Sequence, residues 1–140
     1  MAYETTKVPV VQSQSEIRRM LMKYGGTGVA FISQPPMEGF EGMIPIDGIT
    51  YKIRIAASVP ENSKDVDYET RRIWRVLYWH LKSVFESAAT GVLEFREMML
   101  PYIVVRDNRT IGQHILPELK KAVEGRPERL LPGPAEEINA

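Results

Sequence analysis

Residues 68–89 form the longest stretch of the chain whose apolar side chains repeat at helical spacing. At about 100° per residue, these side chains fill one continuous arc of roughly 140°, which must pack against another layer of structure. The arc contains Ile73, Trp74, Leu77, Tyr78, Leu81, Val84, Phe85 and Ala88. Thr90-Gly91 then interrupts the pattern. The sequence therefore predicts one long helix with a single core face.

A β-hairpin is the second clear element. Asp47-Gly48 readily adopts the positive φ angles of a tight turn, and it separates two apolar arms, residues 43–46 and 49–55. Ile49, Tyr51, Ile53 and Ile55 alternate with Thr50, Lys52 and Arg54, so one face of the second arm is core and the other is wet and basic. Pro45 cannot donate a ladder hydrogen bond, which predicts an edge position or a bulge for the first arm.

Shorter elements surround these two. Ser13 and Glu16 have the spacing of a capping box, which predicts a first helix that ends at Gly25-Gly26. Residues 29–32 suit a short buried strand, and residues 7–11 a short edge strand around Pro9. We expect a short helix over residues 92–100, a turn over 106–109 and a last helix capped by Thr110 and running to Gly125.

The predicted fold is therefore α+β: a small antiparallel sheet, with its hairpin around Asp47-Gly48, packed on one long helix and two or three shorter helices. The chain has 140 residues, 44% of them apolar, which suits a single core. We assign residues 1–125 to one domain. Residues 126–140 are rich in proline, glycine and charge, which predicts an extended or disordered tail.

Composition excludes several classes of function. The chain has no cysteine, so disulfides and thiolate metal sites are absent. Its formal net charge is zero, so binding to nucleic acid or to an anionic membrane would have to be local. No apolar stretch reaches membrane-spanning length, and the start lacks the pattern of a secretory signal, so we expect a cytoplasmic protein without a membrane partner.

The strongest functional lead is a group of cations on the long helix beside its core arc. The adjoining arc contains Arg71, Arg72, Arg75, Trp79, Lys82 and Glu86. One interpretation is that these charges form an ordinary solvent-exposed helix face and that Trp79 packs under a loop or at a subunit contact. They also suit a nucleic-acid site in which cations meet phosphates and the indole stacks on a base. Lys52 and Arg54 extend this site if the helix and the strand face are adjacent; otherwise they are solubilising strand charges.

Signals for catalysis are weak. His80 and His114 lie far apart without a ligand cluster, and Thr50 stands where a nuclease hairpin with Asp47 and Lys52 would need a second acid. The glycines of residues 25–28 lack the lysine of a phosphate loop. We therefore expect no enzyme activity, no catalytic residue, no metal and no cofactor.

Several local motifs resemble those of one protein family. They are Lys7-Val8-Pro9, the first helix over residues 15–25, Arg71-Arg72-x-Trp74-Arg75, Arg109-Thr110-Ile111-Gly112 and Leu130-Leu131-Pro132-Gly133. Together they resemble small uncharacterised proteins of tailed phages and prophages, encoded near replication and recombination functions. The resemblance implies a role near DNA in the cytoplasm of a host cell.

These observations give one main hypothesis and one alternative. The main hypothesis is a non-catalytic accessory protein of phage replication or recombination that binds nucleic acid, preferably single-stranded DNA, through Arg71, Arg72, Arg75, Trp79, Lys82, Lys52 and Arg54. The alternative is a protein–protein adaptor or inhibitor that acts on a host or phage protein, for example a replication protein. We also expect a homodimer, because Leu130-Leu131 and the apolar long helix need burial.

Overall fold

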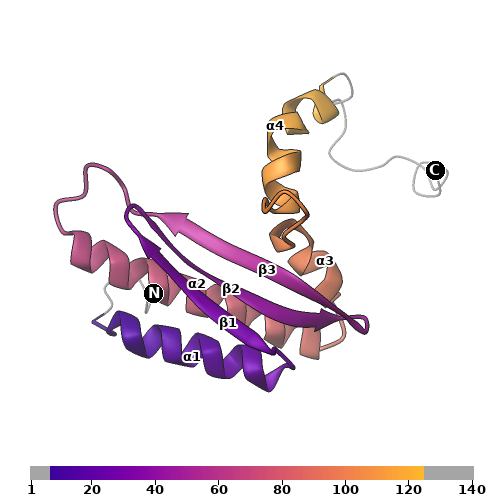
Figure 1. Ribbon diagram of the computed structural model, residues 1–140, viewed down its shortest axis with the longest axis horizontal. Coiled ribbons are helices and arrows are strands. Elements are labelled where there is room, and N and C mark those ends of the chain that lie inside the picture. The colour runs from indigo at the N-terminus through magenta and orange to yellow at the C-terminus, as the bar shows by residue number, and fades with distance from the viewer. Residues whose placement is uncertain (1–6, 125–140) are drawn as a thin grey trace.

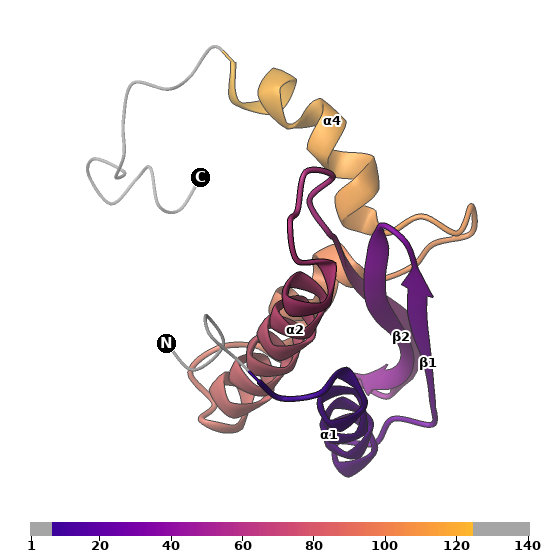
Figure 2. The same ribbon diagram turned by 90° about the vertical axis from the view of Figure 1, so that its left-hand side faces the viewer.

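The computed structural model describes residues 7–124. Its elements are α1 (Val10–Lys23), β1 (Gly28–Gln34), β2 (Met37–Ile46), β3 (Ile49–Ser58), α2 (Val66–Ala89), α3 (Phe95–Met99), the 3₁₀ turn η1 (Leu100–Tyr102) and α4 (Ile111–Val123). Figure 1 shows the three strands as one layer, with α1 and α2 side by side against it and α4 projecting away. The view in Figure 2 places both long helices on the same side of the sheet. The predicted α+β class is confirmed.

The sheet is an antiparallel meander in the order β1-β2-β3. Asp47 (φ 51°) and Gly48 (φ 82°) form the predicted two-residue turn, with Ile46 paired to Ile49. β2 is the central strand of the sheet, but only as far as Met43, the last residue that pairs with β1. Pro45 lies beyond that point and pairs with β3 alone, so the predicted edge position holds at Pro45 and its missing amide has no strand beside it.

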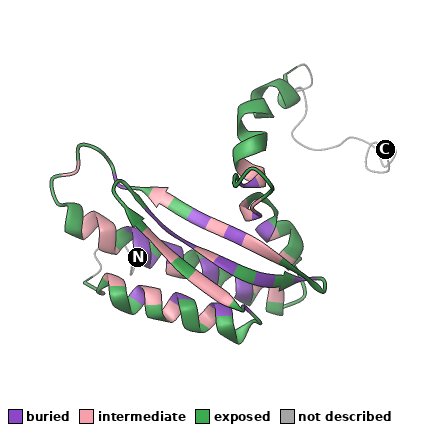
Figure 3. Cartoon of the chain, viewed as in Figure 1, coloured by how far each residue is buried: buried purple, intermediate pink, exposed green. Residues whose placement is uncertain are grey.

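The core lies between the sheet and the two long helices. Phe40 and Ile44 of β2 and Ile53 of β3 are fully buried. Figure 3 shows the buried colour along the strands and along α2. The predicted core arc of α2 is confirmed: its members are buried except Tyr78 and Ala88, which are half-buried. Gly42 allows α1 to approach the sheet closely, because a Cβ atom there would lie 3.3 Å from Leu21 Cδ1.

The N-terminal predictions were partly wrong. Residues 7–9 form no strand, and α1 begins at Val10 with Pro9 as its N-cap. The amides of Gln12 and Ser13 donate to the Pro9 carbonyl, which starts the helix before the expected capping box. Ser13 instead lies within α1, where it is buried. The carboxylate of Glu16 accepts a hydrogen bond from Arg75 of α2. The predicted end at Gly25-Gly26 is confirmed, with Gly25 at φ 93°.

The C-terminal third attaches to the edge of β3. Ile103 forms a bridge with Ile53, and the Val104 amide donates to the Lys52 carbonyl at 2.8 Å. The turn over residues 106–109 is present, and the Thr110 and Gln113 side chains cap α4 reciprocally. The short helix begins at Phe95 rather than at residue 92. The predicted tail, residues 126–140, lies outside the described residues.

Candidate nucleic-acid interface

Arg75, the centre of the predicted basic arc, is turned inward. Its side chain is buried between α2 and α1, where Nη2 donates to Glu16 Oε2. The guanidinium also lies over the Tyr78 ring, 4.0 Å from its centroid. These contacts join the two long helices, so Arg75 has a structural role and is poorly placed to meet a phosphate.

Glu16 is held in its charged form by this arrangement. Partial burial raises the pKa of its carboxyl, but the hydrogen bonds from Arg75 and Gln12 and the charges of Arg75 and Arg19 outweigh burial. The net result is a pKa below the ordinary glutamate value.

Arg71 and Arg72 differ in how accessible they are. Arg71 is half-buried, and its Nε atom is enclosed without a hydrogen-bond partner among residues 7–124. Arg72 is exposed and lies 3.6 Å from Glu69 Oε2, one turn earlier on α2. Such an exposed ion pair is weak and can exchange for another anion.

Trp79 lies on the outer surface of α2 with 38% of its area exposed. Its ring meets Tyr78 edge-on, with centroids 5.5 Å apart, and the Lys82 ammonium lies 4.8 Å from the indole centroid. Lys82 Nζ is also 3.8 Å from Glu86 Oε1. The expected neighbourhood of an indole and a cation is therefore present, and Trp79 is outside the core.

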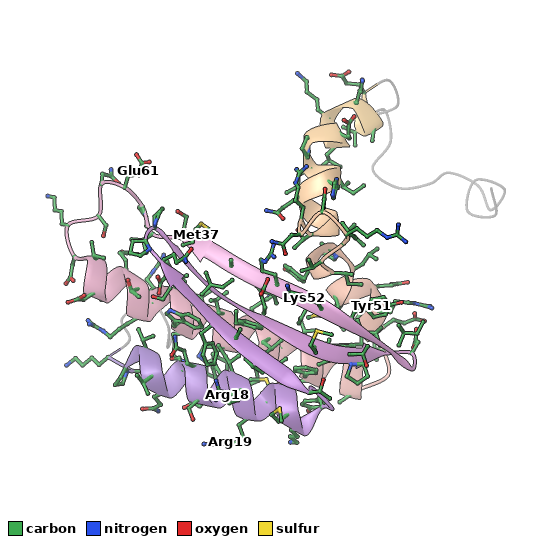
Figure 4. All side chains as sticks on the ribbon, viewed as in Figure 1. Arg18, Arg19, Met37, Tyr51, Lys52 and Glu61 are labelled. Atoms are coloured by element: carbon green, nitrogen blue, oxygen red, sulfur yellow. The ribbon has the colours of Figure 1, made fainter. Side chains whose placement is uncertain are left out.

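A groove between α1 and α2 adds two cations that sequence reasoning missed. This α1–α2 groove has a volume of about 420 Å³. Three cations (Arg19, Lys23 and Lys82), two carboxylates (Glu16 and Glu86) and the rings of Tyr24 and Tyr78 are among its lining residues. Arg19 projects from α1 away from the sheet (Figure 4). Neither Arg19 nor Lys23 forms an ion pair with another residue in the described range. Their spacing of four residues, opposite the buried face of α1, was the available signal.

The charge of the chain is unevenly distributed between its two layers. The helices α1 and α2 together carry seven basic and four acidic side chains, although the whole chain has equal numbers of both. The exposed surface of these two helices, here called the helical face, is therefore positive. Local positive potential of this kind attracts polyanions even when the net charge is zero.

Lys52 and Arg54 do not extend this face. By register they share the opposite face of the sheet with Glu41, and Figure 4 shows Lys52 on β3, across the sheet from Arg19. Arg54 donates from Nε to Glu41 at 2.8 Å and from Nη1 to the Asn108 carbonyl at 2.8 Å. Lys52 Nζ lies 3.6 Å from the same Glu41. The two cations share this one carboxylate, and Arg54 anchors the turn that precedes α4.

A buried carboxylate also escaped sequence reasoning. Glu38 of β2 is buried, and it accepts hydrogen bonds from Trp74 Nε1 at 2.9 Å and from Ser33 Oγ at 2.9 Å. Trp74 donates from the core, whereas Ser33 is an exposed residue of β1. The carboxylate therefore acts as a polar link between the sheet and α2. No local pattern around Glu38 predicts burial.

Other kinds of site are not found in the described part of the chain. Residues 7–124 contain no group of three or more His, Asp or Glu side chains that could hold a metal ion. None of the helices in that range combines the length and apolar composition that crossing a bilayer requires. His80 accepts or donates one hydrogen bond with the Tyr102 hydroxyl at 3.1 Å, and His114 pairs with Asp107 at 2.8 Å.

Comparison with known proteins gave no match: no family model, no curated protein and no solved structure resembles the chain significantly.

Proposed function

We propose that the protein is a non-catalytic accessory protein that binds single-stranded nucleic acid along its helical face. The observation that carries this proposal is the α1–α2 groove, in which the cations Arg19, Lys23 and Lys82 outnumber the carboxylates Glu16 and Glu86 beside the rings of Tyr24 and Tyr78. Glu16 is already paired with the buried Arg75. Cations that follow a groove beside aromatic rings are typical of proteins that bind single strands without sequence preference.

In this proposal Arg19, Lys23, Lys82 and Arg72 contact phosphates, while Trp79 stacks on a base. Lys82 now lies over the indole, so a stacked base would displace its ammonium toward the phosphate backbone. An exposed indole stacks on an unpaired base without the cost of unstacking a base pair, which favours a single strand over a duplex. Arg75 leaves the site because it is buried and paired with Glu16. Lys52 and Arg54 leave it because they lie on the opposite face of the sheet.

The resemblance to phage and prophage proteins suggests where this activity would be used. We place it beside replication or recombination in the cytoplasm of a host cell, where single-stranded DNA is exposed. DNA rather than RNA is the expected ligand on this ground alone, so the binding assay must include both.

The test is fluorescence anisotropy with labelled single-stranded and double-stranded oligonucleotides of about 16 nucleotides. Affinity should fall steeply between about 50 and 200 mM salt. Arg19→Ala with Lys23→Ala should weaken binding and lower the slope of log affinity against log salt by about 0.7 for each lost contact to a single strand.

The matched control loses the same two charges elsewhere. Arg106→Ala with Lys120→Ala changes residues outside the helical face and should leave the salt slope unchanged. Wild-type protein that binds no oligonucleotide at low salt, or equal losses in both double variants, would contradict the proposal.

A protein–protein adaptor or inhibitor is the second candidate function, and the exposed apolar side chains of α4 favour it. Purification of the protein distinguishes the two candidate functions. Nucleic acid that co-purifies and is removed by high salt favours the first function. A different protein that co-purifies in a stoichiometric amount at high salt, and that no longer co-purifies with the Leu119→Asp variant, favours the second.

A further inference from the structure

Tyr24 and Trp79 are the two exposed aromatic side chains of the described chain. Tyr24 is 37% exposed and Trp79 38%, whereas every other Phe, Tyr and Trp side chain within residues 7–124 is buried or half-buried. Both belong to the helical face, Tyr24 at the C-terminal end of α1 and Trp79 on the outer surface of α2. The exposed aromatic rings in this part of the chain are thus confined to its positive face.

A lysine ammonium lies over each of these two rings. Lys23 Nζ is 5.6 Å from the ring centroid of Tyr24, and Lys82 Nζ is 4.8 Å from that of Trp79. Cation–π contacts at exposed sites are weak, so an incoming base can replace the ammonium on the ring while the ammonium moves to a phosphate. Each pair therefore offers both parts of a nucleotide site, a π face and a cation.

The ring of Tyr24 is held in one orientation by the rings behind it. It stacks on Phe85 of α2, with centroids 4.1 Å apart and planes 5° from parallel, and Phe85 stacks in turn with Phe95 at 5.2 Å. Because a stacked ring covers one face, the exposed area of Tyr24 lies on the opposite face and on the ring edge. A base that stacks there meets a ring that is already ordered, which lowers the entropic cost of binding.

The α1–α2 groove connects the two rings. Tyr24 and Lys82 both line it, and Lys82 also lies over Trp79, so Lys82 stands between the rings. Phe85, on which Tyr24 stacks, follows Trp79 by six residues, which corresponds to about 9 Å along α2. Stacked neighbours in one strand lie only about 3.4 Å apart. Neighbouring bases of a stacked strand therefore cannot occupy both rings, and the strand between the two bound bases must pass Lys82.

Two carboxylates also line the groove. Glu16 is paired with the buried Arg75, and Glu86 lies 3.8 Å from Lys82 with 65% of its side chain exposed. Neither forms an ion pair with Lys23. The Lys23 ammonium therefore remains available for a phosphate on the Tyr24 side of the groove.

We propose that the helical face binds a single strand through two separated bases, one stacked on Trp79 and the other on Tyr24, with Lys82 and Lys23 on the phosphates. This inference rests on the proposed function and narrows its ligand. The strand must present two unpaired bases that are not neighbours. A mononucleotide reaches one ring only, and the paired bases inside a duplex reach neither.

The first test uses strands that carry only two bases. In an otherwise abasic strand of about eight residues, two adenines are placed next to each other or separated by up to about four abasic residues. Binding is measured by fluorescence anisotropy. Affinity should be highest when at least one abasic residue separates the bases, and about 5-fold or more above that of the strand with adjacent bases. Equal affinity at every spacing overturns the inference and leaves the proposed function standing. A wild type that binds no oligonucleotide overturns both.

The second test removes the ring of Tyr24. Tyr24→Leu keeps an apolar side chain on Phe85 but has no π face, and it should weaken binding by about 5- to 150-fold, the range for one stacked base. Tyr24→Phe keeps the ring and should bind within about threefold of the wild type. Tyr51→Leu is the matched control, because it makes the same change on β3, outside the helical face.

Two further readouts separate stacking from a structural effect. In Tyr24→Leu the salt slope and the quenching of tryptophan fluorescence at saturation should both stay as in the wild type, because the phosphate contacts and the base on Trp79 remain. A folded Tyr24→Leu variant that binds as tightly as the wild type, or no more weakly than Tyr51→Leu, overturns the inference without affecting the role of Trp79.

Discussion

The ion pair between Arg75 and Glu16 joins α2 to α1 across 59 residues of sequence. It explains why fewer cations of the basic arc of α2 are available to bind an anion than the sequence indicates. The arginine closest to the centre of that arc neutralises a carboxylate of the neighbouring helix, and the accessible cations are displaced toward Arg19 and Lys23. Charge on a helix surface becomes a binding site only where the neighbouring helix leaves it unpaired.

Glu16→Gln should destabilise the protein, because it leaves the buried Arg75 guanidinium without its carboxylate. We expect a loss of about 2–4 kcal/mol in the free energy of unfolding, measured by urea denaturation. Glu69→Gln is the control, since it breaks the exposed pair with Arg72 and should cost at most about 1 kcal/mol. Equal stability of the two variants would show that the Arg75 pair is no stronger than a surface pair.

The same pair predicts a pH dependence. In the folded protein the pKa of Glu16 lies below the ordinary glutamate pKa. The stabilising contribution is therefore complete above that ordinary pKa and is lost as pH falls through the lower folded pKa. As the pH falls from about 5 to about 3, the free energy of unfolding should therefore decrease less for the Glu16→Gln variant than for the wild type. Asp107→Asn is the comparison. The hydrogen bond from His114 is the largest reason why the pKa of Asp107 is also lowered, but this carboxyl is exposed and should contribute less.

Trp79→Ala should separate stacking from charge. Oligonucleotide affinity should fall by about 1–3 kcal/mol while the salt slope stays nearly constant, because no phosphate contact is lost. Trp79→Phe should retain most of the affinity, since it keeps an aromatic face. Urea denaturation checks the fold: Trp79→Ala should cost less stability than Trp74→Ala, for which burial predicts a loss of about 3–5 kcal/mol. Unchanged affinity of a folded Trp79→Ala variant would remove Trp79 from the site.

Glu38→Ala should lower the free energy of unfolding, although it removes a polar group from the core. Trp74 Nε1 and Ser33 Oγ would both lose their buried acceptor, and we expect a cost of about 2–4 kcal/mol in the free energy of unfolding. Glu38→Gln keeps an acceptor for the indole and should cost less. A stable Glu38→Ala variant with unchanged tryptophan fluorescence would show that the carboxylate does not hold Trp74.

The elements that sequence predicted well depend on neighbours in the chain. The periodicity of α2, the Asp47-Gly48 turn and the Thr110 cap are local signals, and each was found in place. Ser13 and Glu16 show the limit of such signals. Their spacing matches a capping box, but Pro9 starts the helix earlier and Arg75 takes the carboxylate, and neither competitor belongs to the motif.

The candidate site was harder to predict for the same reason. Alternation along β3 correctly placed Lys52 and Arg54 on the face opposite the core side chains. Since α2 covers the core face, this local signal already separated the two cations from Trp79. Arg19 and Lys23 belong to the site only because α1 lies beside α2, which is a property of the assembled fold.

Ile103 and Val104 occupy part of the outer edge of β3, through the Ile53 bridge and the Lys52 carbonyl. Unpaired amides and carbonyls at a sheet edge are templates for intermolecular strand addition and fibril growth. At the other edge, among the described residues, β1 (Gly28–Gln34) pairs with β2 alone. The two edges are thus unequally protected, and aggregation of the folded protein at high concentration should begin along β1.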